Sequence, residues 1–167
     1  MRRYGWMLAL AALVLLVDQS SKFWATSVLS GGERIAVIPQ LLEFRLLYNA
    51  GAAFSIGAGA TWVFTLAAAA AVGGILYAGR RLCTTASMAW TVAFGALLGG
   101  ATSHLLDRLF RPPSFAQGHV VDFIDYGGLF VGNVADIALS GSCVLLVLLT
   151  ARGVPLGKVP DAPGSQP

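Results

Sequence analysis

The sequence predicts an all-α integral membrane protein: a bundle of four transmembrane helices with a small extracytoplasmic β-sheet element in its first outer loop. Composition is the first observation behind this prediction. Of the 167 residues, 56% are hydrophobic and only 11% are charged, whereas soluble domains carry about 25% charged residues. A soluble domain of this size could not hide so much apolar surface, because a large part of a small protein's surface stays in contact with water.

The second observation is a set of four apolar stretches that can cross, or nearly cross, a bilayer, for which an α-helix needs about 20 residues. They cover residues 4–26, 61–78, 87–106 and 129–151. The first could instead be a signal peptide, but Asp18 and Lys22 interrupt the usual cleavage zone and three further spans follow. We therefore expect one membrane-embedded domain over residues 1–152, followed by a disordered cytoplasmic tail, residues 153–167, rich in proline and glycine.

The basic residues that flank the spans favour cytoplasmic N- and C-termini. In that orientation the cytoplasmic side holds Arg2, Arg3, Arg80, Arg81, Arg152 and Lys158, and the outer side holds Lys22, Arg34, Arg45, Arg108 and Arg111. The first helix usually dominates the topology, and two arginines directly precede it. Although the net charge is +3, the basic residues are scattered, so no nucleic-acid partner is expected.

The first outer loop is predicted to contain two short strands, Arg34–Ile38 and Leu42–Tyr48, joined by a turn at Pro39-Gln40. In the second strand Glu43 and Arg45 alternate with apolar residues, which is the two-residue period of a half-buried strand. The sequence therefore predicts a small sheet outside the membrane.

The second outer loop, Leu109–Gly128, contains a pair of prolines and a pair of glycines, which break regular structure. The two cysteines are not expected to form a disulfide, because the predicted topology places Cys83 beside a loop and Cys143 within a helix. Neither a CxxC motif nor a Cys/His cluster occurs, so no metal site is expected.

Acidic residues stand where lipid should disfavour them. Asp18 and Lys22 lie four residues apart on the first helix and can pair, which would stabilise the outer helix end. Asp107 and Arg108 end the third span at the same level. They can serve as an interfacial anchor or hold the backbone of a substrate, and the residues alone favour neither interpretation.

Asp136 is predicted about two turns into the fourth span, with Asn133 and Ser140 on the same helix face. Three polar groups on one face of a membrane helix indicate a bundle interior or a wet cavity. Asp122 precedes Asp136 by fourteen positions, and a turn at Gly127-Gly128 could fold it back beside the later aspartate. The two residues are therefore candidates for a carboxylate pair.

Two carboxyl groups in a poorly hydrated site tend to share one proton. One can then act as a general base on water while the other donates a proton to an amide. His104 and His119 lack a serine or cysteine partner in a recognisable nucleophile motif. A proton-coupled transporter and a scaffold without chemistry remain alternatives, although transporters usually show internal repeats and more spans.

Five short motifs follow one another along the four predicted spans and carry most of the polar residues discussed above. They are Asp18–Lys22 (DQSSK), Asn49–Ser55 (NAGAAFS), Gly99–Arg108 (GGATSHLLDR), Val121–Phe123 (VDF) and Asn133–Asp136 (NVAD). In this order they resemble the motifs of the lipoprotein signal peptidase (signal peptidase II) family of bacterial membranes. The resemblance covers most of the chain.

The resemblance implies an aspartic endopeptidase of the bacterial cytoplasmic membrane. It would remove the signal peptide from diacylglyceryl-modified prolipoproteins, cutting just before the lipidated cysteine, and would use no metal or other cofactor. It implies Asp122 and Asp136 as catalytic residues, Asn49, His104, Asp107, Arg108 and Asn133 as substrate-binding residues, and Asp18 and Lys22 as braces of the first helix.

The resemblance also implies an active site toward the extracytoplasmic face, a small sheet lying on the membrane surface and inhibition by globomycin-type peptides. Membrane lipids are further expected partners, and a monomer is the expected state. The chain departs from the family pattern at His104, where asparagine is usual, and at Ser103, which replaces a glycine. Imidazole can titrate near neutral pH, so the substrate contact and the pH optimum can differ here. Gly132 replaces a usual phenylalanine, and Ile137 stands where a small hydroxyl residue is common.

Overall fold

The computed structural model describes residues 2–51, 60–82 and 87–156. Its helices and strands are α1 (Arg2–Val28), β1 (Ile35–Ile38), β2 (Leu42–Asn49), α2 (Thr61–Leu82), α3 (Met88–Phe110), β3 (Val120–Asp125), β4 (Val131–Gly132) and α4 (Val134–Ala151). Three expectations concern residues outside this description: the placement of Cys83, the second half of the motif that begins at Asn49, and the tail beyond residue 156.

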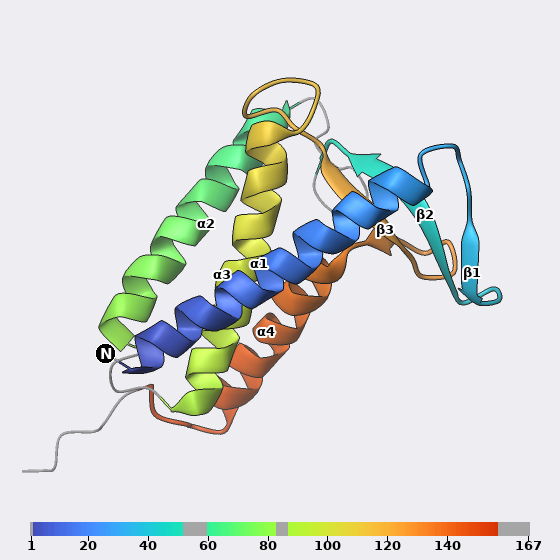
Figure 1. Ribbon diagram of the computed structural model, residues 1–167. Helices are drawn as coiled ribbons and strands as arrows, with labels where there is room; N and C mark the ends of the chain where they lie inside the picture. The colour runs from blue at the N-terminus through green and yellow to red at the C-terminus, as the bar shows by residue number, and fades with distance from the viewer. Residues whose placement is uncertain (1, 52–59, 83–86, 157–167) are drawn as a thin grey trace, which may run out of the picture.

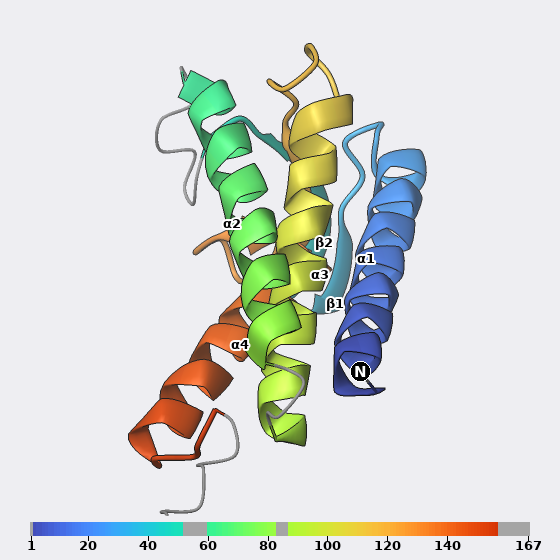
Figure 2. The ribbon, with the colours of Figure 1, turned by 90° about the vertical axis from the view of Figure 1, so that its left-hand side faces the viewer.

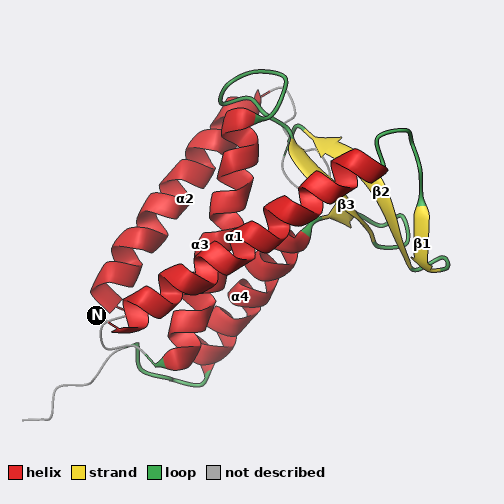
Figure 3. Ribbon diagram, viewed as in Figure 1, coloured by secondary structure: helices red, strands yellow, loops and turns green. Residues whose placement is uncertain are grey.

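The four helices form a bundle, and the sheet projects from one end of it (Figure 1, Figure 3). Each helix is long and apolar enough to cross a membrane, which confirms the predicted four-helix architecture with a small sheet. The start of α1 and the end of α4 lie at the end of the bundle away from the sheet (Figure 1). The two ends of the bundle are therefore different in character: one carries the sheet and the other the ends of the described chain.

Helix α3 stands at the centre of the bundle, with α1, α2 and α4 packed around it (Figure 2). Two glycines of α3 allow α1 to approach closely. A Cβ atom on Gly95 would lie 2.9 Å from the carbonyl oxygen of Met7, and one on Gly99 would lie 2.7 Å from that of Ala11. Small residues at such positions let membrane helices pack backbone against backbone.

The sheet has four antiparallel strands in the order β1-β2-β3-β4. The two strands predicted in the first outer loop are confirmed as β1 and β2, and the chain turns between them at Pro39 and Gln40. Apolar packing joins the sheet to the end of α1: Trp24 makes edge-to-face contacts with Phe44 of β2 and Phe123 of β3, at centroid distances of 5.5 and 6.3 Å.

The prediction that Leu109–Gly128 is a loop without regular structure was wrong for its second half. All six residues of β3, Val120–Asp125, are buried, and β3 pairs with both β2 and β4. The proline pair interrupts the chain only before this strand, and the glycine pair forms the turn after it, where Gly127 and Gly128 have φ angles of 62° and 77°. Asp122 is therefore a strand residue.

The fourth helix begins later than predicted. Residues 129–133 were expected to be helical, but Val131 and Gly132 pair with β3, and α4 starts at Val134. Asn133 caps the helix: its side chain accepts a hydrogen bond from the N–H of Asp136, and the Asp136 carboxylate accepts one from the N–H of Asn133. Asp136 consequently lies in the first turn of α4, not about two turns into the span.

Candidate active site

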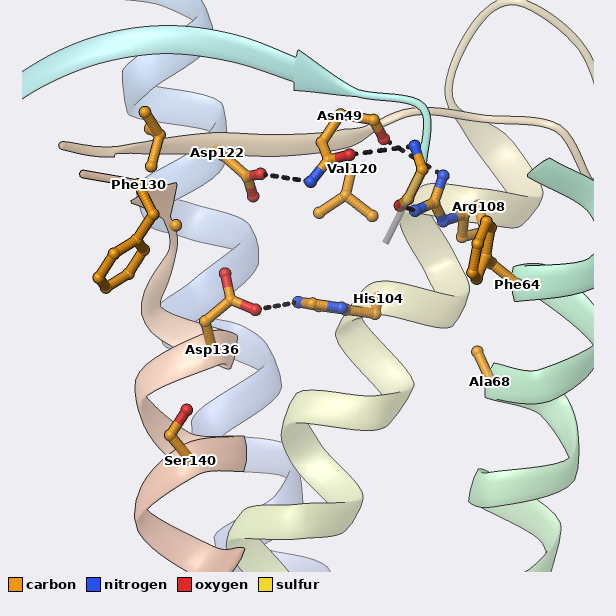
Figure 4. A pocket seen from close by; sticks show the side chains of 13 residues that line it. Asn49, Phe64, Ala68, His104, Arg108, Val120, Asp122, Phe130, Asp136 and Ser140 are labelled. Atoms are coloured by element: carbon orange, nitrogen blue, oxygen red, sulfur yellow. Dashed lines mark hydrogen bonds and ion pairs between the residues drawn. The ribbon is translucent and has the colours of Figure 1, made fainter. Parts of the chain in front are cut away.

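A cavity of about 510 Å³ lies where the sheet meets the helix bundle (Figure 4). Its polar lining comes from Asn49 at the end of β2, His104 and Arg108 of α3, Asp122 of β3, and Asp136 and Ser140 of α4. Its apolar and glycine lining consists of Gly51, Phe64, Ala68, Val120, Phe130, Val131 and Gly132. Five segments that are distant in sequence thus bring the two predicted aspartates into one cavity.

Asp122 is almost completely buried, with 2% of its surface exposed. Its two carboxyl oxygens accept hydrogen bonds from side-chain amides, one from Asn133 Nδ2 at 2.7 Å and one from Asn49 Nδ2 at 3.1 Å. Burial raises the pKa of Asp122 to about 6, and the charge of Asp136 adds to the rise. The two amides and the charge of His104 oppose this rise without cancelling it.

Asp136 is more open, with 39% of its side chain exposed. One carboxylate oxygen accepts the Asn133 N–H at 2.9 Å, and the other lies 3.3 Å from Nε2 of His104. Figure 4 shows His104 reaching toward Asp136 from α3, with Asp122 on the neighbouring strand above them. The N-terminus of α4 also favours a negative charge at this position, because the helix dipole presents partial positive charge there.

Arg108 is committed to the backbone around the cavity. Its guanidinium donates hydrogen bonds to the carbonyl oxygens of residues 49–51 and of Gly118. It also lies over the ring of Phe64, at 5.6 Å from the centroid. These contacts fix the end of β2, and therefore the position from which Asn49 reaches Asp122.

Asp18, Lys22, Asp107 and Arg111 form an ionic network, in which the first three side chains are fully buried and Arg111 is partly exposed. Nζ of Lys22 lies 2.6 Å from a carboxylate oxygen of Asp18 and 2.8 Å from one of Asp107, and Nε of Arg111 lies 2.6 Å from the other Asp107 oxygen. The predicted Asp18–Lys22 pair is thus confirmed. Asp107 faces this network and does not belong to the cavity lining found among the described residues.

The ionic network holds the backbone beside both aspartates of the cavity. Asp18 accepts the N–H of Ala135 at 2.7 Å, and Asp107 accepts the N–H of Val121 at 3.3 Å. Ala135 directly precedes Asp136, and Val121 directly precedes Asp122. The network therefore sets the position of the strand and of the helix start that carry the two carboxyl groups.

Two polar residues that sequence reasoning gave no role complete the network. Gln19 donates to Ser103 Oγ at 2.8 Å and to an Asp107 carboxylate oxygen at 3.0 Å. Ser103 donates its hydroxyl hydrogen to Asp18 at 2.5 Å. Gln19 lies in the motif Asp18–Lys22 and Ser103 in the motif Gly99–Arg108. Their place in these motifs was the one feature of the sequence that could have indicated a role. No comparable signal pointed to Phe64 and Ala68 of α2.

The arrangement can perform general acid–base chemistry. A carboxyl group whose pKa is raised toward neutrality can hold a proton, while its ionised neighbour can accept one from water. Among the residues that the structure describes, no three histidine, cysteine or acidic side chains cluster as metal ligands. The expectation that the enzyme uses no metal stays a prediction. Cys143 is exposed on α4 and is not part of the cavity lining.

Comparison with known families agrees with this geometry. The model of the family described as signal peptidase (SPase) II, Peptidase_A8, matches residues 10–152. The chain belongs to the signal peptidase II family. Family membership makes it a peptidase, and with four membrane-spanning helices it is a multi-pass membrane protein.

Individual signal peptidase II relatives are similar over most of the chain. The lipoprotein signal peptidase of Leifsonia xyli subsp. xyli (strain CTCB07) is 45% identical over 152 residues, which cover 90% of this chain and 69% of the relative. That of Bifidobacterium longum (strain NCC 2705) is 47% identical over 145 residues, or 87% of this chain and 78% of the relative. A bacterial membrane enzyme solved by the in meso method at 2.3 Å resolution has a TM-score of 0.78 and 25% identity, with 95% of this chain and 94% of that chain covered.

Proposed function

We propose that the protein removes the signal peptide from diacylglyceryl-modified prolipoproteins by cutting just before the lipidated cysteine, with Asp122 and Asp136 as the catalytic pair. One observation carries the assignment of the residues. Two carboxyl groups share a single cavity at the sheet end of the bundle, and burial raises the pKa of one of them, Asp122, to about 6. The names of the relatives, lipoprotein signal peptidases, support the substrate class.

The chemistry follows from the pair. One carboxylate takes a proton from water as the new C–O bond forms at the scissile carbonyl carbon. The other carboxyl group gives its proton to the amide nitrogen as the C–N bond breaks, which releases the new amino terminus. The pair still holds one proton after this step, now on the carboxyl group that acted as the base, and transfer of that proton to the other carboxyl group restores the starting state.

The cavity is suited to an apolar substrate. Phe64 and Ala68 of α2 face it from one side and Phe130 from the other (Figure 4), and Val131 also lines it. We assign substrate contacts to Asn49, which donates to Asp122 and stands at the cavity wall. Arg108 shapes the wall through the backbone of residues 49–51. Asn133 orients both aspartates, and Asp107 supports the ionic network with Asp18 and Lys22.

We further propose that the chain lies in the bacterial cytoplasmic membrane with both termini in the cytoplasm and the cavity toward the extracytoplasmic face. The ends of the described chain lie opposite the sheet, and four spans return the chain to its starting side (Figure 1). Single cysteines placed at Arg3 and Gln117 in a cysteine-free background test this. A membrane-impermeant thiol reagent added to intact cells should label position 117 alone. Labelling of position 3 alone would show that the protein has the opposite orientation in the membrane.

The remaining expected partners are membrane lipids, and the expected state is a monomer. Globomycin-type peptides should compete with substrate for the cavity, raising the apparent KM without lowering kcat. Inhibition that lowers kcat at saturating substrate would show that the inhibitor binds outside the cavity.

A measurement of the molecular mass of the protein in detergent tests whether it is a monomer.

The decisive test of the proposed function uses purified protein in lipid and a diacylglyceryl-modified prolipoprotein. The parent should cleave it, and Asp122→Asn and Asp136→Asn should each lose about 100-fold or more of the rate, since a positioned acid or base contributes about 10²–10⁴-fold. Glu43→Gln is the matched control: it removes a carboxylate of the same sheet that lies outside the cavity. Cleavage by both aspartate variants at the parent rate would refute the assignment.

A further inference from the structure

We propose that His104 is a positioning residue that makes the aspartate pair asymmetric: its Nε2–H donates to Asp136, which keeps Asp136 ionised as the general base and leaves Asp122 to hold the proton as the general acid. The inference rests on the proposed function and deepens it, because it assigns different roles to two like residues.

The position of the hydrogen on His104 follows from Asn133. The amide nitrogen of Asn133 donates to Asp122 at 2.7 Å and to the carbonyl oxygen of Val121 at 3.3 Å, and its oxygen accepts the N–H of Asp136 at 3.0 Å. Since these partners fix which end of the amide is oxygen, the atom 3.4 Å from His104 Nε2 is an acceptor. The other neighbour of Nε2 is an oxygen of Asp136, at 3.3 Å. With two acceptors beside it, Nε2 carries the hydrogen.

The two carboxyl groups differ in the way this assignment requires. Asp122 is 2% exposed and receives hydrogen bonds from two neutral amides, so burial favours its protonated form. Asp136 is 39% exposed, caps a helix N-terminus and faces His104. Exposure, the helix dipole and a donated hydrogen all favour a negative charge on Asp136.

The other charged groups around the pair are already engaged. They are Asp107 and Arg108 on α3 and Asp18 and Lys22 on α1. The titratable ring of Tyr126, which follows β3, stacks on Phe130. Lys22 pairs with two carboxylates, and Arg108 donates to four backbone carbonyls. From α2 the cavity receives Phe64 and Ala68, which do not ionise. His104 is thus the titratable donor in direct contact with Asp136 among the described residues.

The assignment fixes the direction of proton transfer. Asp136 takes a proton from the attacking water while Asp122 gives its proton to the leaving nitrogen. Removal of the His104 donor would make the two carboxyl groups more alike, so the proton would spend part of its time on Asp136. Enzyme in that form lacks an ionised base and is inactive.

The test measures kcat and KM for prolipoprotein cleavage as a function of pH in His104→Ala and His104→Gln. We expect His104→Ala to lower kcat about 10- to 100-fold, the equivalent of one hydrogen bond to a charged group, with KM little changed. Its pH profile should move to higher pH, because Asp136 loses a group that favours its ionised form and Asp122 loses one that lowers its pKa. His104→Gln, whose amide N–H reaches about as far as Nε2, should restore most of kcat.

His119→Gln is the matched control, since it makes the same substitution at a histidine outside the cavity lining. It should leave kcat and the pH profile unchanged. Two results would overturn the inference: a higher KM in His104→Ala with unchanged kcat and pH profile, or no recovery of kcat in His104→Gln. Neither result affects the proposed function, which fails only if the parent does not cleave or if Asp122→Asn and Asp136→Asn cleave normally.

Discussion

Two groups of aspartates lie at the same end of this protein, and they differ in the charge of the side chains that contact them. In the ionic network Asp18 and Asp107 each have a basic nitrogen within 2.8 Å, and the group is electrically balanced by Lys22 and Arg111. In the cavity Asp122 has only neutral amides as hydrogen-bond partners in the described part of the chain. A carboxylate that is balanced by a cation holds structure, whereas one that is buried beside neutral donors keeps a proton available for chemistry.

Strand β3 shows the same contrast within four residues. Asp125 is as buried as Asp122, but it accepts hydrogen bonds from the N–H of Gly128 and from Arg45. Burial raises the pKa of Asp125, yet the Gly128 and Arg45 contacts outweigh it and leave the pKa below the ordinary value. The pKa of Asp122 moves the other way, to about 6. Charged and backbone donors thus accompany the lowered pKa of Asp125, and neutral amide donors accompany the raised pKa of Asp122.

The largest effect on stability is expected at the centre of the network. Lys22→Met leaves Asp18 and Asp107 buried without their shared cation, and removal of one partner of a buried ion pair costs about 3–5 kcal/mol. The free energy of unfolding in detergent should fall by that amount. A loss below 1 kcal/mol would show that the two carboxylates do not depend on the lysine.

A smaller effect, on the pH dependence of cleavage, is expected where the Asn49 amide donates to Asp122. Asn49→Ala removes the donor at 3.1 Å that lowers the pKa of Asp122, so this pKa should rise further above about 6. Because Asp122 acts in its protonated form, cleavage should then persist to higher pH. The rise should be about one pH unit, equivalent to 1.4 kcal/mol, and is read from the alkaline limb of kcat/KM. An unmoved limb would assign that limb to another group.

Asp122 should also make the stability of the protein depend on pH. The folded-state pKa of Asp122, about 6, exceeds its ordinary value of 3.8. Its contribution to stability is therefore fully present below about pH 4 and is lost as the pH rises through about 6. Asp122→Asn should flatten the melting temperature over this window. A variant that keeps the parent's pH dependence there would show that Asp122 is not the buried group that titrates.

The smallest effect is expected at the exposed ion pair of the sheet. Arg34 and Glu43 lie 3.2 Å apart, but 64% of the arginine side chain is exposed. Exposed pairs contribute about 0–1 kcal/mol. Glu43→Gln should therefore change neither the unfolding free energy beyond that range nor the cleavage rate, and a larger loss of either would give the sheet a role in the site.

Much of the fold and part of the cavity lining could be predicted from the sequence. Apolar runs fixed the number of spans, because lipid demands long apolar helices, and spacing predicted the pair of Asp18 and Lys22. The alternation around Glu43 predicted strands β1 and β2. The motifs contained the charged and most of the polar residues of the cavity lining, namely Asn49, His104, Arg108, Asp122 and Asp136, but not its apolar residues.

What could not be predicted depends on tertiary contacts. The residues of β3 combine β-branched and aromatic side chains with two aspartates but do not alternate with a two-residue period, and pairing with β2 and β4 makes them a strand. The start of α4 was placed too early because Leu129–Gly132 are apolar or small, whereas the capping box at Asn133 decides where the helix begins. The ion pair between Lys22 of α1 and Asp107 of α3 joins two helices. It could not be predicted, because the spacing of residues along the chain does not show which residues of different helices lie close together.

The most direct test of the division between the two groups compares Asp122→Asn with Asp107→Asn, measuring prolipoprotein cleavage and thermal unfolding on the same samples at neutral pH. Asp122→Asn should lose about 100-fold or more of the cleavage rate while its melting temperature stays equal to that of the parent or rises. Asp107→Asn should unfold at a clearly lower temperature, because Lys22 and Arg111 lose a charged partner. An Asp122→Asn protein that is as destabilised as Asp107→Asn, or that still cleaves at the parent rate, would contradict the account.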